Sequence, residues 1–273
     1  MYIGIGAALF TYEGYFLLHQ TPKLDVLLLL SGAATMFVYL LIRVAAVSRI
    51  KEYAPEKRWD FFTRNLFLMQ VLTVITFLIT VVTYLMLPRS IQVLLFFPGI
   101  ISLLYGIPIR FGKKHFRLRD IGVTKIFMIA FVWAFIGSFL PATNSELPIV
   151  SGDVILLFFA HYLFIFGITL PFDIKDLTID AQHQVKTIPA IIGIQKSYNL
   201  SFLSLLLSTL LYVVMQQLTT SEQDFSLPLC IAMLLSSWSI YLSRKKADNY
   251  LYFGLIDGML IIQSLLVIVF ALN

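Results

Sequence analysis

Long apolar runs alternate with short polar breaks along the chain, as at residues 19–22, 88–90 and 143–148. A helix needs about 20 mostly apolar residues to cross the hydrocarbon core of a bilayer. Runs of roughly this length recur nine times, so we predict an all-α integral membrane protein with nine transmembrane helices. The predicted spans cover residues 2–18, 24–42, 66–87, 91–109, 122–141, 150–172, 198–216, 226–243 and 250–272.

The composition of the chain agrees with this prediction. Of its 273 residues, 59% are apolar and only 13% are charged, whereas a soluble domain has about 25% charged residues. Too few charged side chains remain to cover a water-facing surface, which excludes an ordinary soluble enzyme and a disordered chain. The single cysteine, Cys230, lies in an apolar run and provides neither a disulfide framework nor a zinc site.

The basic residues indicate how the spans are oriented. The chain has 20 lysines and arginines, and all except Lys23 and Arg89 lie in or beside every second connection between spans. Cytoplasmic loops carry such an excess of positive charge. We therefore predict a cytoplasmic N-terminus, an external C-terminus and one membrane domain over residues 1–273, with no nucleic-acid partner. The predicted cytoplasmic loops cover about 43–65, 110–121, 173–197 and 244–249.

Three carboxylates follow the sixth predicted span on the cytoplasmic side. Asp173, Asp176 and Asp180 are spaced i, i+3 and i+7, so a continuing helix would place them on one face. Like charges at this spacing repel one another unless a cation lies among them, and Mg²⁺ prefers carboxylate ligands. The alternative is a solvated acidic loop end paired with Lys175 and Lys186, because acids near a basic loop are common.

Residues downstream connect this motif to a known family. Asp180 is followed by Lys186-Thr-Ile-Pro189 and Gly193, and the whole run resembles the second aspartate motif of the UbiA-type prenyltransferase superfamily. The region between the fourth and fifth predicted spans is also similar to that family, at Tyr105-Gly-Ile-Pro108, Arg119-Asp120, Lys125 and Trp133. The resemblance implies a bundle of nine spans whose active site opens to the cytoplasm.

The resemblance also implies an activity: Mg²⁺-dependent transfer of an isoprenyl group from its diphosphate to a lipophilic acceptor in the bilayer. Asp176 and Asp180 would be the catalytic acids and would bind Mg²⁺ together with Asp173. The implied location is the inner (plasma) membrane of a bacterium. Five basic residues would contact the diphosphate: Arg43, Arg49, Arg119, Lys125 and Lys186.

The first aspartate motif of the family is missing. Some bacterial relatives have Tyr-Asn-x-Asp-Arg at its position, and Tyr39 and Arg43 fit that pattern, but Leu40 and Ile42 replace the Asn and the Asp. Three interpretations follow. The remaining acids bind one Mg²⁺ while Arg43 and Arg49 neutralise the diphosphate, since a guanidinium binds phosphate oxygens well. Alternatively, the protein is a non-catalytic isoprenoid-diphosphate-binding or assembly protein. In the third interpretation, the protein has lost ligand binding and retains only the fold.

Two further residues are candidates for the cavity. Asp257 lies inside the last predicted span, and acids in that setting indicate a functional site by default, although a hydrogen bond to a neighbouring helix would also explain it. Tyr105 could face the isoprenyl tail with its ring. Members of the family usually carry an amphipathic segment before the first span. Here that span begins at residue 2, so we expect that the segment is absent or that the chain begins inside a longer protein.

Overall fold

The computed structural model describes residues 2–50, 64–106, 109–111, 114–116, 121–182, 185–219, 223–245 and 251–272. Its contacts divide the chain into two compact units. Unit 1 comprises Met1–Ala8 and Asp25–Leu118, and unit 2 comprises Leu9–Leu24 and Arg119–Asn273. Helix α1 (Tyr2–Leu17) therefore begins in unit 1 and ends in unit 2.

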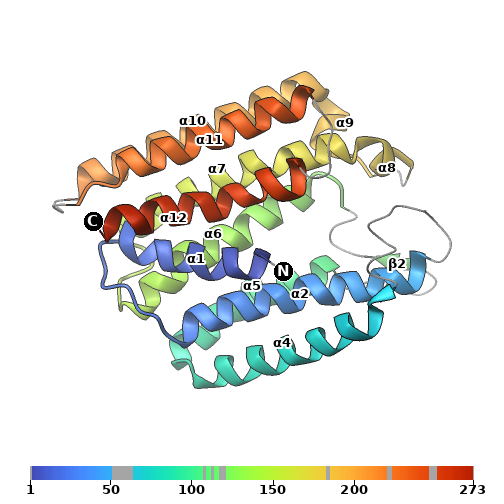
Figure 1. Ribbon diagram of the computed structural model, residues 1–273, viewed down its shortest axis with the longest axis horizontal. Helices are drawn as coiled ribbons and strands as arrows, with labels where there is room; N and C mark the ends of the chain where they lie inside the picture. The colour runs from blue at the N-terminus through green and yellow to red at the C-terminus, as the bar shows by residue number, and fades with distance from the viewer. Residues whose placement is uncertain are drawn as a thin grey trace. The chain divides into compact units, whose positions relative to one another are not determined.

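Unit 1 is built around one long helix. Helix α2 (Val26–Ile50) packs against α4 (Leu66–Met86) and α5 (Arg89–Gly106), and Figure 1 shows α2 and α4 side by side. The start of α1 crosses α2 closely, because a Cβ on Gly4 would lie 2.8 Å from the carbonyl oxygen of Gly32. Strands β1 (Ile109–Phe111) and β2 (Lys114–Phe116) form an antiparallel hairpin.

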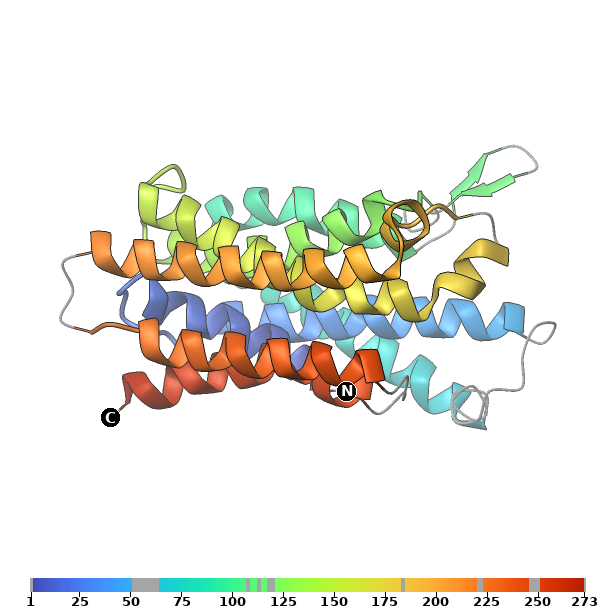
Figure 2. The same ribbon diagram turned by 90° about the horizontal axis from the view of Figure 1, so that it is seen from above.

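Unit 2 contains the remaining helices, with α7 at its centre. Helix α7 (Gly152–Lys175) packs against α6 (Thr124–Asn144) and α10 (Ile194–Leu218). Helix α11 (Ser226–Lys245) lies between α10 and α12 (Gly258–Ala271), as Figure 2 shows. Three short elements complete the unit: α8 (Leu177–Gln182), α9 (Ile188–Ile192) and the π-helix η2 (Leu251–Ile256), which directly precedes α12.

Eight helices in the described part of the chain are long and apolar enough to cross a membrane. They correspond to the second through ninth predicted spans, so the prediction of an all-α membrane protein is confirmed to that extent. The first predicted span, residues 2–18, forms α1 with 16 residues, which is shorter than the usual length of a spanning helix. Nine spans therefore remain a prediction.

Three boundaries differ from the predicted loops. Helix α2 continues to Ile50, so Arg43 and Arg49 lie in a helix and not in a loop that begins at residue 43. Residues 43–50 contain no Gly or Pro to end the helix. The fourth predicted span stops at Gly106, and Ile109 begins strand β1. The region 173–197 contains α8 and α9 rather than an irregular loop. Residues 51–63 and 246–250 lie outside the described part of the chain.

Small residues allow the helices of unit 2 to approach one another closely. Ser201 Oγ donates a hydrogen bond to the carbonyl oxygen of Gly167 at 2.6 Å, and Ser208 Oγ donates to that of Ala160 at 2.8 Å, both from α10 to α7. A Cβ on Gly14 of α1 would overlap with the carbonyl oxygen of Gly137 on α6. In a bilayer, where burying apolar surface gains little, such close packing and interhelical hydrogen bonds drive helix association.

A buried polar cluster connects three helices in the middle of unit 2. The carboxylate of Glu13 on α1 accepts hydrogen bonds from Gln263 Nε2 at 2.8 Å and Ser264 Oγ at 2.7 Å on α12, and Gln263 Nε2 also donates to Tyr212 Oη on α10 at 3.1 Å. All four side chains are buried. Partners of this kind offset the desolvation of a buried carboxyl group, so the cluster anchors α1 to unit 2.

The crossing of α1 and α6 gives the first prediction. Gly14→Ala should lower the free energy of unfolding by about 1–3 kcal/mol, because the added methyl group overpacks the crossing and forces the helices apart. An unfolding titration of the purified protein in mixed micelles measures this change. Gly152→Ala at the start of α7 is the matched control, since its Cβ would meet no atom within 4 Å. Equal stability of the two variants would contradict the close crossing.

Candidate active site at the end of α7

The last turn of α7 and the short helix after it carry the three aspartates of the predicted motif. Asp173 lies in that last turn with 1% of its side chain exposed. The helix is interrupted at Asp176, which is its C-cap, and α8 then brings Asp180 into the site. The helix is therefore not continuous over the three aspartates, but the backbone N–H of Asp180 still bonds to the carbonyl oxygen of Asp176 at 2.8 Å across the break.

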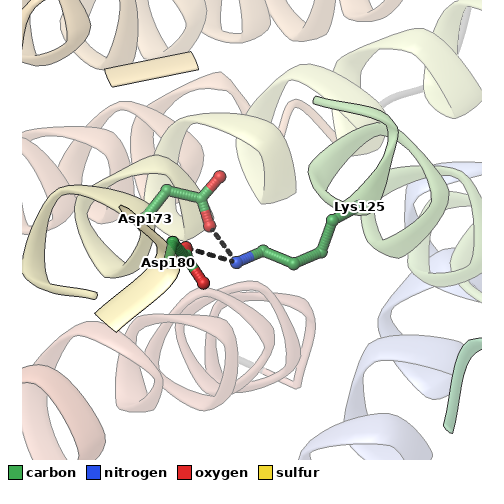
Figure 3. A network of polar contacts seen from close by, with 3 residues as sticks. All are labelled: Lys125, Asp173 and Asp180. Atoms are coloured by element: carbon green, nitrogen blue, oxygen red, sulfur yellow. Dashed lines mark ion pairs between the residues drawn. The ribbon is translucent and has the colours of Figure 1, made fainter. Parts of the chain in front are cut away.

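A lysine from another helix joins the first and the last of these carboxylates. Lys125, in the first turn of α6, places Nζ 2.6 Å from Asp173 Oδ1 and 3.5 Å from Asp180 Oδ2. Figure 3 shows the ammonium group of Lys125 directed at both carboxylates. The side chains of Lys125 and Asp180 are 12% and 18% exposed, so all three groups are largely removed from water. We call these three residues the Lys125 triad.

The segment that follows α8 supports the start of α6. Gly122 adopts a left-handed φ of +38°, and a Cβ there would overlap with the carbonyl oxygen of Lys186. Only glycine combines that backbone conformation with such a close approach. The three residues after Lys186, namely Thr187, Ile188 and Pro189, are buried. Thr187 is the N-cap of α9, and the helix begins at Ile188. The Lys-Thr-Ile-Pro run therefore holds the turn that positions Lys125.

The Lys125 triad has unused capacity to bind a cation. Its formal charge is −1 when both carboxylates are ionised. Oδ2 of Asp173 and Oγ1 of Thr187 are buried and have no hydrogen-bond partner in the described part of the chain. Oδ2 of Asp180 is also buried without a hydrogen bond, and its partner is the ammonium group of Lys125 at 3.5 Å. Buried oxygens without a donor cost roughly 1–3 kcal/mol each. Two carboxylates with a single lysine between their charges fit Mg²⁺, which completes its six positions with water and phosphate oxygens.

The three aspartates do not form one set of ligands. Among the described residues, no group of three or more histidine, cysteine, aspartate or glutamate side chains is arranged to hold a metal ion. Asp176 lies within electrostatic range of Asp173 and also of Tyr252 on η2. The structure thus offers two carboxylates directly to a cation at the Lys125 triad and places the third nearby.

Aromatic rings lie beside the aspartate motif. No pattern in the sequence pointed to these rings. Lys175 Nζ lies 4.1 Å from the ring centroid of Phe253 and 5.2 Å from that of Tyr252. Phe172 packs against both rings, with centroids 5.6 and 5.7 Å away. Cations are attracted to such ring faces. We call Phe172, Tyr252 and Phe253 the aromatic cluster.

Comparisons with known proteins show which fold the chain has. No protein-family model and no curated protein matches the sequence, but solved structures match over almost the whole chain. A UbiA homolog from Aeropyrum pernix K1 aligns with a TM-score of 0.67 at 15% identity, over 99% of this chain and 96% of the other. A UbiA homolog from Archaeoglobus fulgidus bound to GPP and Mg²⁺ aligns with a TM-score of 0.67 at 13% identity, over 98% and 97%. A digeranylgeranylglyceryl phosphate synthase aligns with a TM-score of 0.59 at 14% identity, over 98% and 90%. The chain has the UbiA fold.

The predicted site residues in unit 2 differ in how they relate to the Lys125 triad. Lys125, Asp173 and Asp180 meet directly. Asp176 and Lys186 lie in the same region of unit 2, but Lys186 is exposed, and the contact with Gly122 is made by its backbone. Asp257 follows η2 in the same unit, where its backbone N–H bonds to the carbonyl oxygen of Tyr252 at 3.2 Å, a π-type bond of the kind often found at functional sites.

The other predicted residues lie in unit 1 or outside the described part of the chain. Arg43 donates a hydrogen bond from Nη2 to Tyr39 Oη at 3.0 Å and stacks on its ring at 4.9 Å. Tyr105 is half-buried in α5. The side chain of Arg49 and the whole of Arg119 are not described.

The residues at which we expected the polar side chains of the first motif, Leu40 and Ile42, are apolar and packed. Leu40 is 2% exposed, and the Ile42 side chain contacts Gly106 so closely that a Cβ there would overlap with it. Ile42 therefore packs α2 against α5 within unit 1. Apolar side chains of this kind offer no ligand to a metal ion.

The burial of the Lys125 triad gives the second prediction. Asp173→Asn should lower the free energy of unfolding by about 3 kcal/mol, because it leaves a largely buried ammonium group without its nearest counter-charge. Asp180→Asn should cost about 1 kcal/mol or less, because this carboxylate is more exposed and farther from Nζ. Unfolding titrations in mixed micelles compare the two variants. The reverse order of stability would contradict the geometry of the triad.

Proposed function

We propose that this protein is a membrane prenyltransferase that transfers an isoprenyl group from an isoprenyl diphosphate to a lipophilic acceptor, with Mg²⁺ bound at the Lys125 triad. The observation that carries the proposal is the pairing of Lys125 with Asp173 and Asp180 in a fold shared with UbiA homologues solved with GPP or DMAPP and Mg²⁺. A diphosphate needs both a divalent cation and fixed positive groups, and this site combines carboxylates with a lysine.

The binding roles follow from the donor types. Asp173 would hold Mg²⁺ through Oδ2, which has no hydrogen-bond partner in the described part of the chain. Asp180 would hold it through its carboxylate, and Asp176 is the proposed third acid. Bound Mg²⁺ would neutralise charge that develops on the diphosphate as it leaves. The basic residues proposed to contact the diphosphate are Lys125, Lys186, Arg43, Arg49 and Arg119. Lysine is a compact donor that can follow a phosphate oxygen, and arginine offers two parallel hydrogen bonds.

The transfer step would proceed through a carbocation. The bond between the allylic carbon and the diphosphate oxygen breaks, and its electron pair leaves with the inorganic diphosphate. The acceptor then forms a bond to the allylic carbon and releases a proton to solvent. Lys125 would donate a hydrogen bond to the departing oxygen, where negative charge increases. The ring faces of the aromatic cluster are suited to the transient positive charge, as is Tyr105 by our sequence-based proposal.

The membrane setting explains how both substrates would reach the site. The apolar helices offer a lipid-like environment to an isoprenyl tail, while the charged motif lies at the end of α7. We place this end on the cytoplasmic side of a bacterial plasma membrane, with the N-terminus inside and the C-terminus outside, from the distribution of basic residues.

One observation favours a second candidate function, a protein that binds isoprenoid diphosphates without transferring them. Leu40 and Ile42 lie where we expected the polar residues of the first motif. Leu40 is buried, and Ile42 packs against Gly106. Fewer acidic ligands would mean fewer bound cations and weaker stabilisation of the leaving group. In that case the Lys125 triad would still bind a diphosphate, but the allylic bond would not break.

Binding of GPP tests the proposal first. The purified protein should bind GPP in the presence of Mg²⁺, and the affinity should fall by at least about tenfold in Asp173→Asn and in Asp180→Asn, because each loses a charged ligand of the cation. Asp153→Asn is the matched control, since it removes the same charge from the first turn of the same helix. Binding that is independent of Mg²⁺, or that is unchanged in both site variants, would contradict the proposed site.

Transfer is measured next, with radiolabelled GPP and a bacterial lipid extract as the source of acceptors. A labelled lipid that appears with wild type and not with Asp180→Asn would support the prenyltransferase. Mg²⁺-dependent binding without any labelled product, with GPP or with longer donors, would support the binding protein instead.

A further inference from the structure

We propose that Lys125 is a resident counter-cation of the site: its ammonium group occupies the space between Asp173 and Asp180 until a diphosphate arrives, so that a divalent cation binds well only together with the diphosphate. This inference rests on the proposed function and adds an order of binding to it. It is carried by the position of Nζ, 2.6 Å from one carboxylate and 3.5 Å from the other.

The ammonium group and a bridging metal ion would compete for the same carboxylates. Mg²⁺ binds carboxylate oxygens at about 2.1 Å, so an ion shared by Asp173 and Asp180 would lie within a few ångströms of Nζ. Two cations that close repel each other strongly where water is largely excluded, and here both carboxylates and the lysine are at least four-fifths buried. Metal binding therefore requires Lys125 to move.

A diphosphate supplies the alternative partner that Lys125 needs. The lysine side chain is a flexible four-carbon stem with a compact charge, and it can transfer its hydrogen bonds from carboxylate to phosphate oxygens. Without a diphosphate, that movement would separate a largely buried ammonium group from Asp173 and Asp180, and the loss of both ion pairs is costly. The diphosphate and the divalent cation should therefore each raise the affinity for the other, because coupling between two ligands is reciprocal.

The oxygens that the lysine does not satisfy explain why the site can still accept a metal. Oδ2 of Asp173 has no hydrogen-bond donor in the described part of the chain, and Oδ2 of Asp180 has only the longer contact with Nζ at 3.5 Å, so the lysine satisfies the pair only in part. A resident lysine keeps the two buried carboxylates from repelling each other. It leaves a residual negative charge that attracts the cation once the diphosphate is present.

Binding of Mn²⁺ alone tests the inference, with Mn²⁺ used as a paramagnetic substitute for Mg²⁺ and free Mn²⁺ followed by electron paramagnetic resonance. Without any diphosphate, Lys125→Met should bind Mn²⁺ at least about tenfold more tightly than wild type, because the competing charge is gone. Lys125→Arg, which keeps the charge, should bind no more tightly than wild type. Lys23→Met is the matched control: it also removes one lysine charge, but from a residue bonded to the carbonyl oxygen of Asn144 at the other end of α6.

Two further measurements keep the test decisive. Lys125→Gln keeps a donor for Asp173 and carries the same expectation as Lys125→Met if the latter does not fold. In wild type, saturating GPP should raise the affinity for Mn²⁺ at least about tenfold, after correction for Mn²⁺ bound by free GPP, and this gain should shrink in Lys125→Met or Lys125→Gln.

The outcomes separate the inference from the proposed function. If wild type binds GPP with Mn²⁺ but no neutral variant gains affinity for Mn²⁺ alone, or if GPP leaves the wild-type affinity unchanged, the resident counter-cation is overturned and the proposed site stands. If wild type binds neither GPP with Mn²⁺ nor Mn²⁺ alone, both are overturned.

Discussion

The need to neutralise two carboxylates at the end of a mostly buried helix governs the architecture of unit 2. Asp173 is almost fully buried in the last turn of α7, and Asp180 returns to the same place on α8. Isolated negative charges in this setting would be costly, so a cation must be supplied from elsewhere in the bundle. Helix α6 supplies it through Lys125, and its first turn is held in place where Gly122 meets Lys186.

Close helix packing makes this pairing possible. Serines on α10 donate to backbone carbonyls of α7, and glycines at the contact of α1 with α6 let the two backbones touch. The buried cluster around Glu13 then attaches α1 to α12 and α10. Interhelical contacts of this type fix the rotation of each helix about its axis. That rotation is what directs Lys125 toward α7.

Where the resemblance led us to expect the first aspartate motif, unit 1 has apolar packing residues. In unit 1, Leu40 is buried and Ile42 fits against Gly106, so the residues that replace the expected Asn and Asp stabilise a helix contact. Any catalytic activity must then depend more heavily on the acids of unit 2 and on basic side chains. A lysine already placed between two of those acids is consistent with a site that uses fewer metal ligands.

Apolar runs of membrane-spanning length determined the all-α membrane class and, within a few residues, the eight helices that can cross a bilayer. The spacing of Asp173, Asp176 and Asp180, followed by the Lys-Thr-Ile-Pro run, located the candidate site and the resemblance to UbiA prenyltransferases. These features are encoded by residues close together in the chain, where periodicity and spacing report directly on local structure. The break of α7 at Asp176 and the extension of α2 beyond residue 43 depend on backbone hydrogen bonds that hydropathy does not register.

Only the tertiary structure decided which cation meets which acid. Five basic residues were candidates for the site, and in the described part of the chain the packing of α6 against α7 brings Lys125 to Asp173 and Asp180. The aromatic cluster likewise combines Phe172 with rings from η2 that are distant in the chain. The sequence specifies each helix through neighbouring residues, whereas contacts between helices depend on their relative rotation and depth, which no local pattern records.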